Sequence, residues 1–233
     1  GGVRQADEAS AWCPQPKSIA SGRIGRLDED CLYLNIYTTA KNTSAKHPVM
    51  VWIHGGGHTT GSGMSLFYSG ARLAEKGVVM VAINYRLGPF GFMAHPLLSK
   101  ESAKNVSGNY GFLDEIAALK WVNRNISAFG GDPDRVTIFG ESAGAASVSR
   151  LMVSPLARDL FHRAISQSGG PFGRNRHIRD SRNFQESAES IGKKVEALLG
   201  CEKDADPLKC MRGKSHQEIL KAAKPAQGLY GRG

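Results

Sequence analysis

A serine flanked by two glycines is the residue of this sequence best suited to covalent chemistry. The pentapeptide GESAG, residues 140–144, follows the apolar run RVTIF and leads into the run AASVSRLMV. In a G-x-S-x-G turn between a strand and a helix, the glycines permit a tight backbone and the serine hydroxyl stands clear of the sheet. The pattern therefore predicts that Ser142 is a nucleophile.

A serine that attacks an ester also needs hydrogen-bond donors for the oxyanion that forms. The segment WIHGGGH, residues 52–58, places three glycines directly after an apolar run. Backbone N–H groups of such a loop can face a ligand without an intervening Cβ. His54 and His58 lie on this loop, and we expect them to be structural or to line a pocket rather than to act as a general base.

Apolar runs alternate with amphipathic segments along the chain, which is typical of an α/β sheet covered on both faces. The run GVVMVAINY is apolar on both faces, so we expect a fully buried strand there. We expect strands at 31–38, 48–54, 77–85, 136–139 and 163–169, and helices at 111–126, directly after Ser142, and from about Phe184 to Leu199.

Length and composition favour one large folded domain, 1–233 being part of it. The chain has 233 residues, of which 41% are hydrophobic and 22% charged, enough to bury a core. It has no apolar run of the roughly 20 residues that a membrane span needs, and its start lacks the apolar centre of a signal peptide. Because the sequence begins without Met and stops at GLYGRG, we expect it to be a piece of a longer protein.

The net charge of +9 does not indicate a nucleic-acid partner, because the excess is spread over the chain. One dense patch, RNRHIRDSR, is not interleaved with aromatic residues, and we interpret it as a solvated surface segment, with an anion contact as the alternative. Its arginines are Arg174, Arg176, Arg179 and Arg182.

The cysteines favour an oxidising compartment. Four cysteines allow three pairings, and we prefer the two that close short loops. They are Cys13, Cys31, Cys201 and Cys210. Neither a CxxC motif nor a Cys/His metal spacing occurs, so the sequence indicates no metal and no cofactor.

Three N-x-S/T triplets are candidate glycosylation sites, at Asn42, Asn105 and Asn125. Asn125 is the weakest candidate because it lies at the end of an expected helix. Together with the cysteines, these sites favour the secretory pathway, either secretion or the lumen of the endoplasmic reticulum. Chance triplets and buried thiols are the alternative.

Five segments in order, EDCLYLNIY, VWIHGGG, NYRLGPFGF, NYGFLDEIAALKWVNRNISAFGGDPDRVTIFGESAG and AISQSG, resemble the type-B carboxylesterase and cholinesterase family. The resemblance covers essentially the whole chain. It implies an α/β-hydrolase fold, with a mostly parallel central sheet and helices on both faces, incomplete at both ends. It also implies the disulfides Cys13–Cys31 and Cys201–Cys210.

The resemblance implies a role for each residue of the two motifs. Ser142 would carry the acyl group, and the N–H groups of Gly56, Gly57 and Ala143 would form the oxyanion hole. Glu141 would be a buried electrostatic neighbour of the serine. The reaction would be a two-step acyl transfer.

The triad's acid and histidine follow the serine in this fold, and in the family both lie far downstream. Three histidines follow Ser142 in this chain, namely His162, His177 and His216. We do not expect any of them to be the base, because one adjoins a strand and the others lie on a loop and a helix elsewhere in the topology.

Two positions depart from the family's pattern. His58 replaces a bulky apolar residue and is expected to narrow or polarise the acyl pocket. Glu115 replaces a glutamine, and we expect this change to be nearly neutral if the side chain faces solvent.

Two classes of function follow from the resemblance: a serine esterase acting on a small-molecule ester, and a cholinesterase-like adhesion protein without catalysis. The retained Ser142 favours the esterase. Between Cys13 and Cys31 the chain has no aromatic residue that could hold a quaternary ammonium, and it carries Lys17, Arg23 and Arg26. We therefore expect uncharged esters to be preferred over choline esters.

Overall fold

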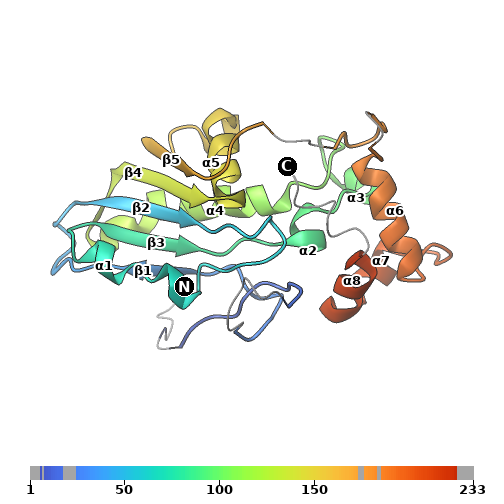
Figure 1. Ribbon diagram of the computed structural model, residues 1–233, viewed down its shortest axis with the longest axis horizontal. Coiled ribbons are helices and arrows are strands. Elements are labelled where there is room, and N and C mark those ends of the chain that lie inside the picture. Colours follow the sequence, from blue (N-terminus) through green and yellow to red (C-terminus); the bar gives the residue numbers. More distant parts are fainter. Residues whose placement is uncertain (1–5, 7, 18–24, 173–175, 183–184, 225–233) are drawn as a thin grey trace.

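A single five-stranded sheet forms the centre of the computed structural model, which describes residues 6, 8–17, 25–172, 176–182 and 185–224 (Figure 1). The strand order is β1-β3-β2-β4-β5. The strands are β1 (Leu34–Tyr37), β2 (His47–Ile53), β3 (Val79–Ile83), β4 (Gly131–Glu141) and β5 (Arg163–Gln167). Only the β1–β3 pair among these is antiparallel; β2, β3, β4 and β5 run parallel.

Helices connect the strands and continue beyond them. The α-helices are α1 (Ala71–Ala74), α2 (Gly88–Phe92), α3 (Pro96–Glu101), α4 (Tyr110–Asn125), α5 (Ala143–Val153), α6 (Ala188–Leu198), α7 (Pro207–Arg212) and α8 (His216–Ala223). Short 3₁₀ turns are η2 (Leu66–Tyr68), η3 (Ile126–Phe129) and η4 (Pro155–Ala157).

The side chains of β2 point alternately to the two faces of the sheet and pack into two separate cores. Val51 and Ile53 are fully buried in a cluster that includes Leu119 of α4 and Val148 of α5. Trp52 points to the opposite face, where a smaller cluster includes Tyr68 of η2. Because successive strand residues face opposite sides, one apolar run can fill both layers.

The expected elements are present, but their bounds differ. The strands expected at 31–38 and 77–85 are shorter, at Leu34–Tyr37 and Val79–Ile83. The strand expected at 136–139 is longer and begins at Gly131. The helix expected from about Phe184, a residue outside the described ranges, begins at Ala188, because the Ser187 side chain accepts a hydrogen bond from the N–H of Ser190 and caps the helix there. The helix expected at 111–126 gives way after Asn125 to the 3₁₀ turn η3, which Gly130 caps with a φ of 76°.

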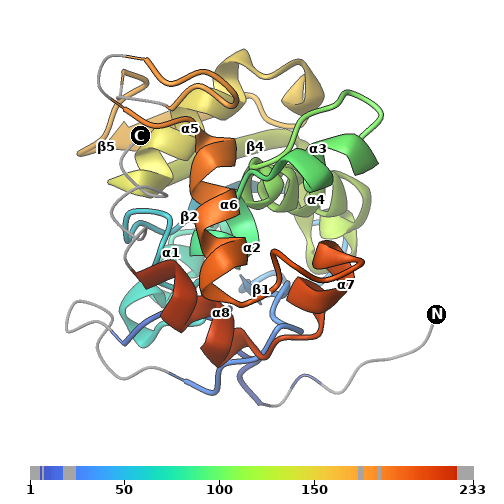
Figure 2. The same ribbon diagram turned by 90° about the vertical axis from the view of Figure 1, so that its right-hand side faces the viewer.

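Both disulfides have the expected local pairing. Cys13 joins Cys31, and Cys201 joins Cys210. The second bond closes the loop between α6 and α7, which lie with α8 at one end of the molecule (Figure 1) and face the viewer in Figure 2. These three helices have a core of their own that includes Val195.

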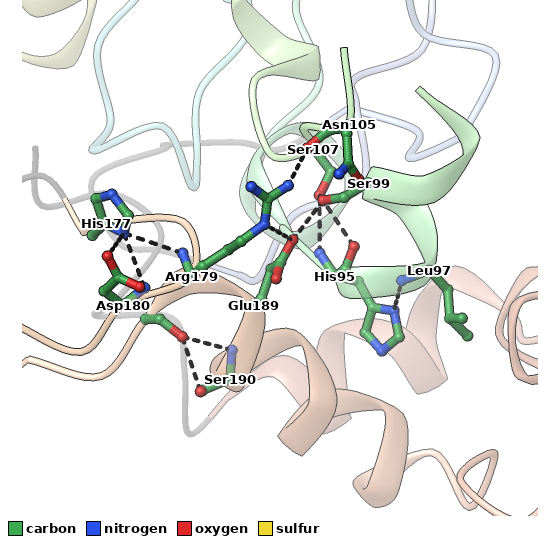
Figure 3. A network of polar contacts seen from close by, with 11 residues as sticks. His95, Leu97, Ser99, Asn105, Ser107, His177, Arg179, Asp180, Glu189 and Ser190 are labelled. Atoms are coloured by element: carbon green, nitrogen blue, oxygen red, sulfur yellow. Dashed lines mark hydrogen bonds and ion pairs between the residues drawn. The ribbon is translucent and has the colours of Figure 1, made fainter. Parts of the chain in front are cut away.

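Helix α6 is attached to the α3 region by a polar network (Figure 3). The Ser99 hydroxyl donates to Glu189 Oε1 at 2.6 Å, and His95 Nε2 lies 3.1 Å from Glu196 Oε2. Arg179 adds to it, since its guanidinium donates to the carbonyl of Asn105 and lies 3.9 Å from the Glu189 carboxylate. The network holds the C-terminal helices against the sheet domain.

The arginine-rich segment is therefore exposed but not uniformly solvated. Arg179 joins two segments, whereas the Arg182 guanidinium pairs with nearby Asp180, at 2.7 Å. Arg176 donates to the Glu186 carbonyl at 2.8 Å. Arg174 lies outside the described residues.

The outer edge of β5 is unpaired within the described part of the chain, since β5 ends the strand order. Its residues are largely exposed, and Ile165 is 44% exposed. Exposed apolar side chains also occur at Met152, Val153 and Phe172 nearby in sequence.

None of the described helices is long and apolar enough to cross a membrane.

We predict that residues 1–233, expressed alone in an oxidising compartment, are poorly soluble and self-associate through the β5 edge, because the unpaired backbone groups of an open edge strand, with exposed Ile165 on it, can pair with another chain. Ile165→Lys should raise the monomeric fraction measured by size-exclusion chromatography with light scattering. Val106→Lys, at an apolar position that is 45% exposed but lies in a loop, is the matched control. An equal gain from both substitutions would contradict a specific role of the edge.

Candidate active site

Ser142 occupies the sharp turn between β4 and α5. Its backbone has φ 55° and ψ −117°, a conformation that is strained for a residue with a Cβ. The Ser142 N–H donates to the Gln167 carbonyl of β5 at 2.9 Å, and the Ala146 N–H donates to the Ser142 carbonyl at 3.0 Å. These bonds on both sides hold the serine at the carboxyl edge of the sheet, as the G-x-S-x-G pattern predicts.

The two flanking glycines are required by close backbone contacts. A Cβ on Gly144 would lie 2.1 Å from the carbonyl oxygen of Ile53, and one on Gly140 would lie 2.6 Å from the backbone of Gly144. Such distances are impossible for a real side chain, so the turn can approach β2 only with glycine at both positions.

The glycine loop that follows β2 lies against this turn. A Cβ on Gly55 would be 3.3 Å from the Ser142 Cβ. Gly56 and Gly57 have φ values of 101° and 62°, which turn their peptide groups out of the strand direction. The N–H groups of Thr59 and Thr60 both donate to the Gly56 carbonyl at 3.0 Å and close the loop.

Three backbone donors near the serine make no hydrogen bond to any described residue. They are the N–H groups of Gly56, Gly57 and Ala143. Ala143 is the first residue of α5, where the N–H has no partner within the helix. The helix dipole adds positive partial charge at the same point. These donors can bind a negatively charged oxygen beside Ser142.

The prediction of a buried Glu141 is wrong for this chain, because its side chain is exposed. Glu141 ends β4, and its carboxylate extends beyond the sheet toward Gly55, whose Cβ would lie 2.9 Å from Glu141 Oε2. Glu141 therefore lies close to Ser142. The pKa of the Tyr68 hydroxyl is raised mainly by burial and, to a smaller extent, by the negative charge of Glu141.

The histidines that follow Ser142 lie in unsuitable places. His162 precedes β5 and pairs with Val136, at the opposite end of the sheet from the serine. His177 accepts from backbone N–H groups of its own loop, and His216 begins α8. Within the described ranges, no hydrogen bond joins any of them to Ser142.

His54 is a structural residue, as expected. Its ring is fully buried, stacks on Tyr85 at 4.4 Å between centroids, and lies 2.8 Å from the Gly55 carbonyl through Nδ1. Burial lowers the pKa of His54 to about 4, so the ring is neutral at neutral pH. The Tyr85 hydroxyl donates to the His54 carbonyl at 2.7 Å and fixes the start of the glycine loop.

His58 and Glu115, the two positions that depart from the expected pattern, belong to one buried network. His58 Nε2 lies 3.0 Å from the Ser147 hydroxyl, which donates to Glu115 Oε1 at 2.8 Å. Glu115 and Ser147 are fully buried, and His58 is 4% exposed. The condition that Glu115 faces solvent therefore fails, because α4 turns this residue toward α5.

Ser147 was not found from the sequence. Its only signal is a serine placed among apolar residues in AASVSRLMV, five positions after Ser142. Small polar residues are common in helices, so this signal has no meaning until the helix is packed against His58 and Glu115.

The candidate glycosylation sites differ in their surroundings. Asn42 and Asn105 are exposed. The Asn125 side-chain nitrogen donates to the Trp121 carbonyl at 2.8 Å at the end of α4, which agrees with its rank as the weakest candidate.

A cavity of about 330 Å³ lies at a distance from this chemistry, lined by residues of α2, α3 and the C-terminal helices that include Phe90, Leu98 and Met211. It contains neither Ser142 nor the glycine loop, and we do not assign it to the site. Among the described residues, no group of three or more metal-ligating side chains occurs.

The elbow, the glycine loop and the mostly parallel sheet together define an α/β-hydrolase. A model of the carboxylesterase family matches residues 1–231. The chain is 46% identical to the human cocaine esterase, over 99% of this chain and 41% of that protein. It is 55% identical to the fumonisin B1 esterase of Sphingopyxis macrogoltabida, over 72% of this chain and 32% of that protein.

Comparison with solved structures gives the same family. A carboxylesterase of Geobacillus stearothermophilus superimposes with a TM-score of 0.83 at 40% identity, covering 98% of this chain and 44% of the other. The chain belongs to the carboxylesterase family. It spans between 32% and 41% of the length of the two relatives named above.

The buried Glu115 makes a testable contribution to stability. Burial raises the pKa of its carboxyl from 4.5 to about 8, against the opposing effects of the Ser147 hydrogen bond and the Arg150 charge. Because the folded-state pKa exceeds the unfolded one, the contribution of Glu115 to the free energy of unfolding is fully present below about pH 4.5 and is lost as the pH rises to about 8, at up to about 1.4 kcal/mol per pH unit.

We predict that Glu115→Gln in the complete protein removes most of this fall, since the amide keeps the shape of the carboxyl without its ionisation. The difference in free energy of unfolding between variant and wild type should grow from pH 5 to pH 8 in denaturant titrations. Parallel curves over that range would show that Glu115 does not titrate as described.

Proposed function

We propose that residues 1–233 are part of a single α/β-hydrolase domain of a serine hydrolase that cleaves carboxylic esters through an acyl-enzyme on Ser142. One observation carries the proposal: a serine with strained backbone lies beside the backbone N–H groups of Gly56, Gly57 and Ala143, which donate to none of the residues that the structure describes. A nucleophile and an oxyanion site are the two parts that acyl transfer needs.

In the proposed reaction, the Ser142 oxygen attacks the ester carbonyl carbon while a general base takes its proton. The carbonyl oxygen becomes an oxyanion that accepts hydrogen bonds from the three N–H groups. The carbon–oxygen bond then breaks, and the leaving alkoxide receives the proton from the base. Water attacks the acyl-enzyme in the same manner and releases the acid.

We place the general base and its carboxylate partner outside residues 1–233, because the histidines after Ser142 that the structure describes lie elsewhere. Exposed Glu141 is proposed as an electrostatic neighbour of the serine and not as the triad acid. Residues 1–233 alone should thus show no turnover above a Ser142→Ala control.

We predict that, in the complete protein, Ser142 is labelled covalently by an organophosphate, because an elbow serine beside an oxyanion site attacks tetrahedral phosphorus as well as carbon. Peptide mass spectrometry identifies the labelled residue, and Ser142→Ala is the control. Labelling elsewhere, or undiminished hydrolysis by Ser142→Ala, would remove the nucleophile assignment. A protein that neither labels nor hydrolyses would instead fit the adhesion class.

We propose that neutral esters are preferred. The loop that the first disulfide closes contains no aromatic residue, and its basic residues Lys17, Arg23 and Arg26 disfavour a cation. Matched acyl esters of choline and of a neutral alcohol should differ in kcat/KM by about tenfold or more in favour of the neutral ester, since a lost cation–π contact is worth about 1–2 kcal/mol. A marked preference for choline would reverse this proposal.

We also propose passage through the secretory pathway. The two disulfides and the exposed acceptor asparagines Asn42 and Asn105 support it. Enzymatic deglycosylation of the protein from its native source should lower its mass, and an unchanged mass together with free thiols would contradict the proposal.

A further inference from the structure

The proposed oxyanion site is divided between two elements of the fold. Gly56 and Gly57 belong to the loop after β2, whereas Ala143 begins α5. Such donors are effective only if they are fixed before reaction, within about 0.5 Å of the productive geometry. A run of three glycines is flexible by nature, so its position against α5 needs a separate restraint.

His58 is the first side chain after the glycines, and it reaches from the loop to α5. Its backbone has φ 55°, and the ring turns inward so that Nε2 lies 3.0 Å from the Ser147 hydroxyl. The ring also interacts with the backbone of Ala143 itself, which partly offsets the lowering of its pKa. One imidazole thus contacts the helix turn that holds Ser142 and the Ala143 donor.

The connection continues to a third element. Ser147 donates to Glu115 Oε1 on α4 at 2.8 Å, so the three side chains form a continuous buried chain. Phe92 and Phe112 pack against the ring at 5.0 and 5.5 Å between centroids. The Gly88 N–H donates to the His58 carbonyl at 2.7 Å, which also ties the loop to α2.

The three hydrogen-bonded side chains His58, Ser147 and Glu115 are neutral near pH 7. Burial lowers the pKa of His58 to about 3, and the positive charge of Arg150 adds to this effect. Burial raises the pKa of Glu115 to about 8, although the charge of Arg150 opposes this shift. Since neither end carries charge, the interaction is directional hydrogen bonding, which fixes orientation rather than supplying a proton.

We propose that His58, through Ser147 and Glu115, is a positioning residue that locks the glycine loop against α5 and sets the geometry of the oxyanion site. This inference rests on the proposed esterase function. A simpler reading is that His58 merely fills the core. The two differ in their effect on folded enzyme, because a packing residue alters stability and a positioning residue alters kcat with little change in KM.

The test is a double-mutant cycle in the complete protein, with kcat and KM measured on a neutral ester and cooperative unfolding checked for each variant. His58→Leu should lower kcat about 10- to 100-fold with KM within about threefold, less than the loss expected for removing a donor outright. His58→Gln, whose amide nitrogen can donate from the same place, should recover kcat to within about fivefold of wild type.

Ser147→Ala should lower kcat about 5- to 30-fold in the wild-type background and have no further effect in the His58→Leu background. The reason is that the effects of two substitutions within one hydrogen-bonded network do not add. Ser149→Ala is the matched control: it lies on the same helix but bonds to the Ala145 carbonyl, and its kcat should equal that of wild type.

The outcomes separate the inference from the proposed function. If wild type shows neither Ser142 labelling nor Ser142-dependent turnover, both fail. If wild type is active but His58→Leu or Ser147→Ala keeps its kcat, or if the two effects multiply, only the positioning role is overturned. Should His58→Leu not fold, Ser147→Ala and His58→Gln decide, and an unchanged kcat for Ser147→Ala overturns the role.

Discussion

The site depends on backbone packed directly against backbone where β2, β4 and α5 meet. Gly144 lies so close to the Ile53 carbonyl that no Cβ fits between them, and no Cβ fits between Gly140 and the backbone of Gly144 either. This contact brings the end of β2, with its glycine loop, beside the turn that carries Ser142. Without it, the proposed nucleophile and the proposed oxyanion donors would belong to separate parts of the molecule.

The contact also explains why the parallel strands matter. The carboxyl ends of β2 and β4 share one edge of the sheet, with Ile53 paired to Gly140 in register. Each strand therefore delivers its motif to the same place. The fully apolar interior of β3, buried along its whole length, keeps β2 in the centre of the sheet, where its position is held from both sides.

The buried polar side chains His58, Ser147 and Glu115 are held by hydrogen bonds rather than by backbone packing. Burying Glu115 and His58 is unfavourable for their charged forms, and the fold accommodates them as neutral groups joined by Ser147. Glu115 Oε2 has no hydrogen-bond partner among the described residues, so the network is tolerated rather than ideal. Such a cost is typical of a region that serves function more than stability.

The sequence alone determined the features that depend on neighbours in the chain. The GESAG turn, the glycine loop, the strands and the two short disulfide loops follow from local spacing, because turns, strand periodicity and short loop closures are set by adjacent residues. Glu141 and Glu115 could not be placed in this way: Glu141 was expected to be buried and is exposed, and the sequence left open whether Glu115 faces solvent, whereas the structure buries it. Their surroundings come from segments that are distant in sequence. Ser147 lies 32 positions from Glu115 and 89 from His58. Only the packing of α4, α5 and the glycine loop decided that these three side chains meet, because burial and hydrogen bonding between remote segments are properties of the assembled fold.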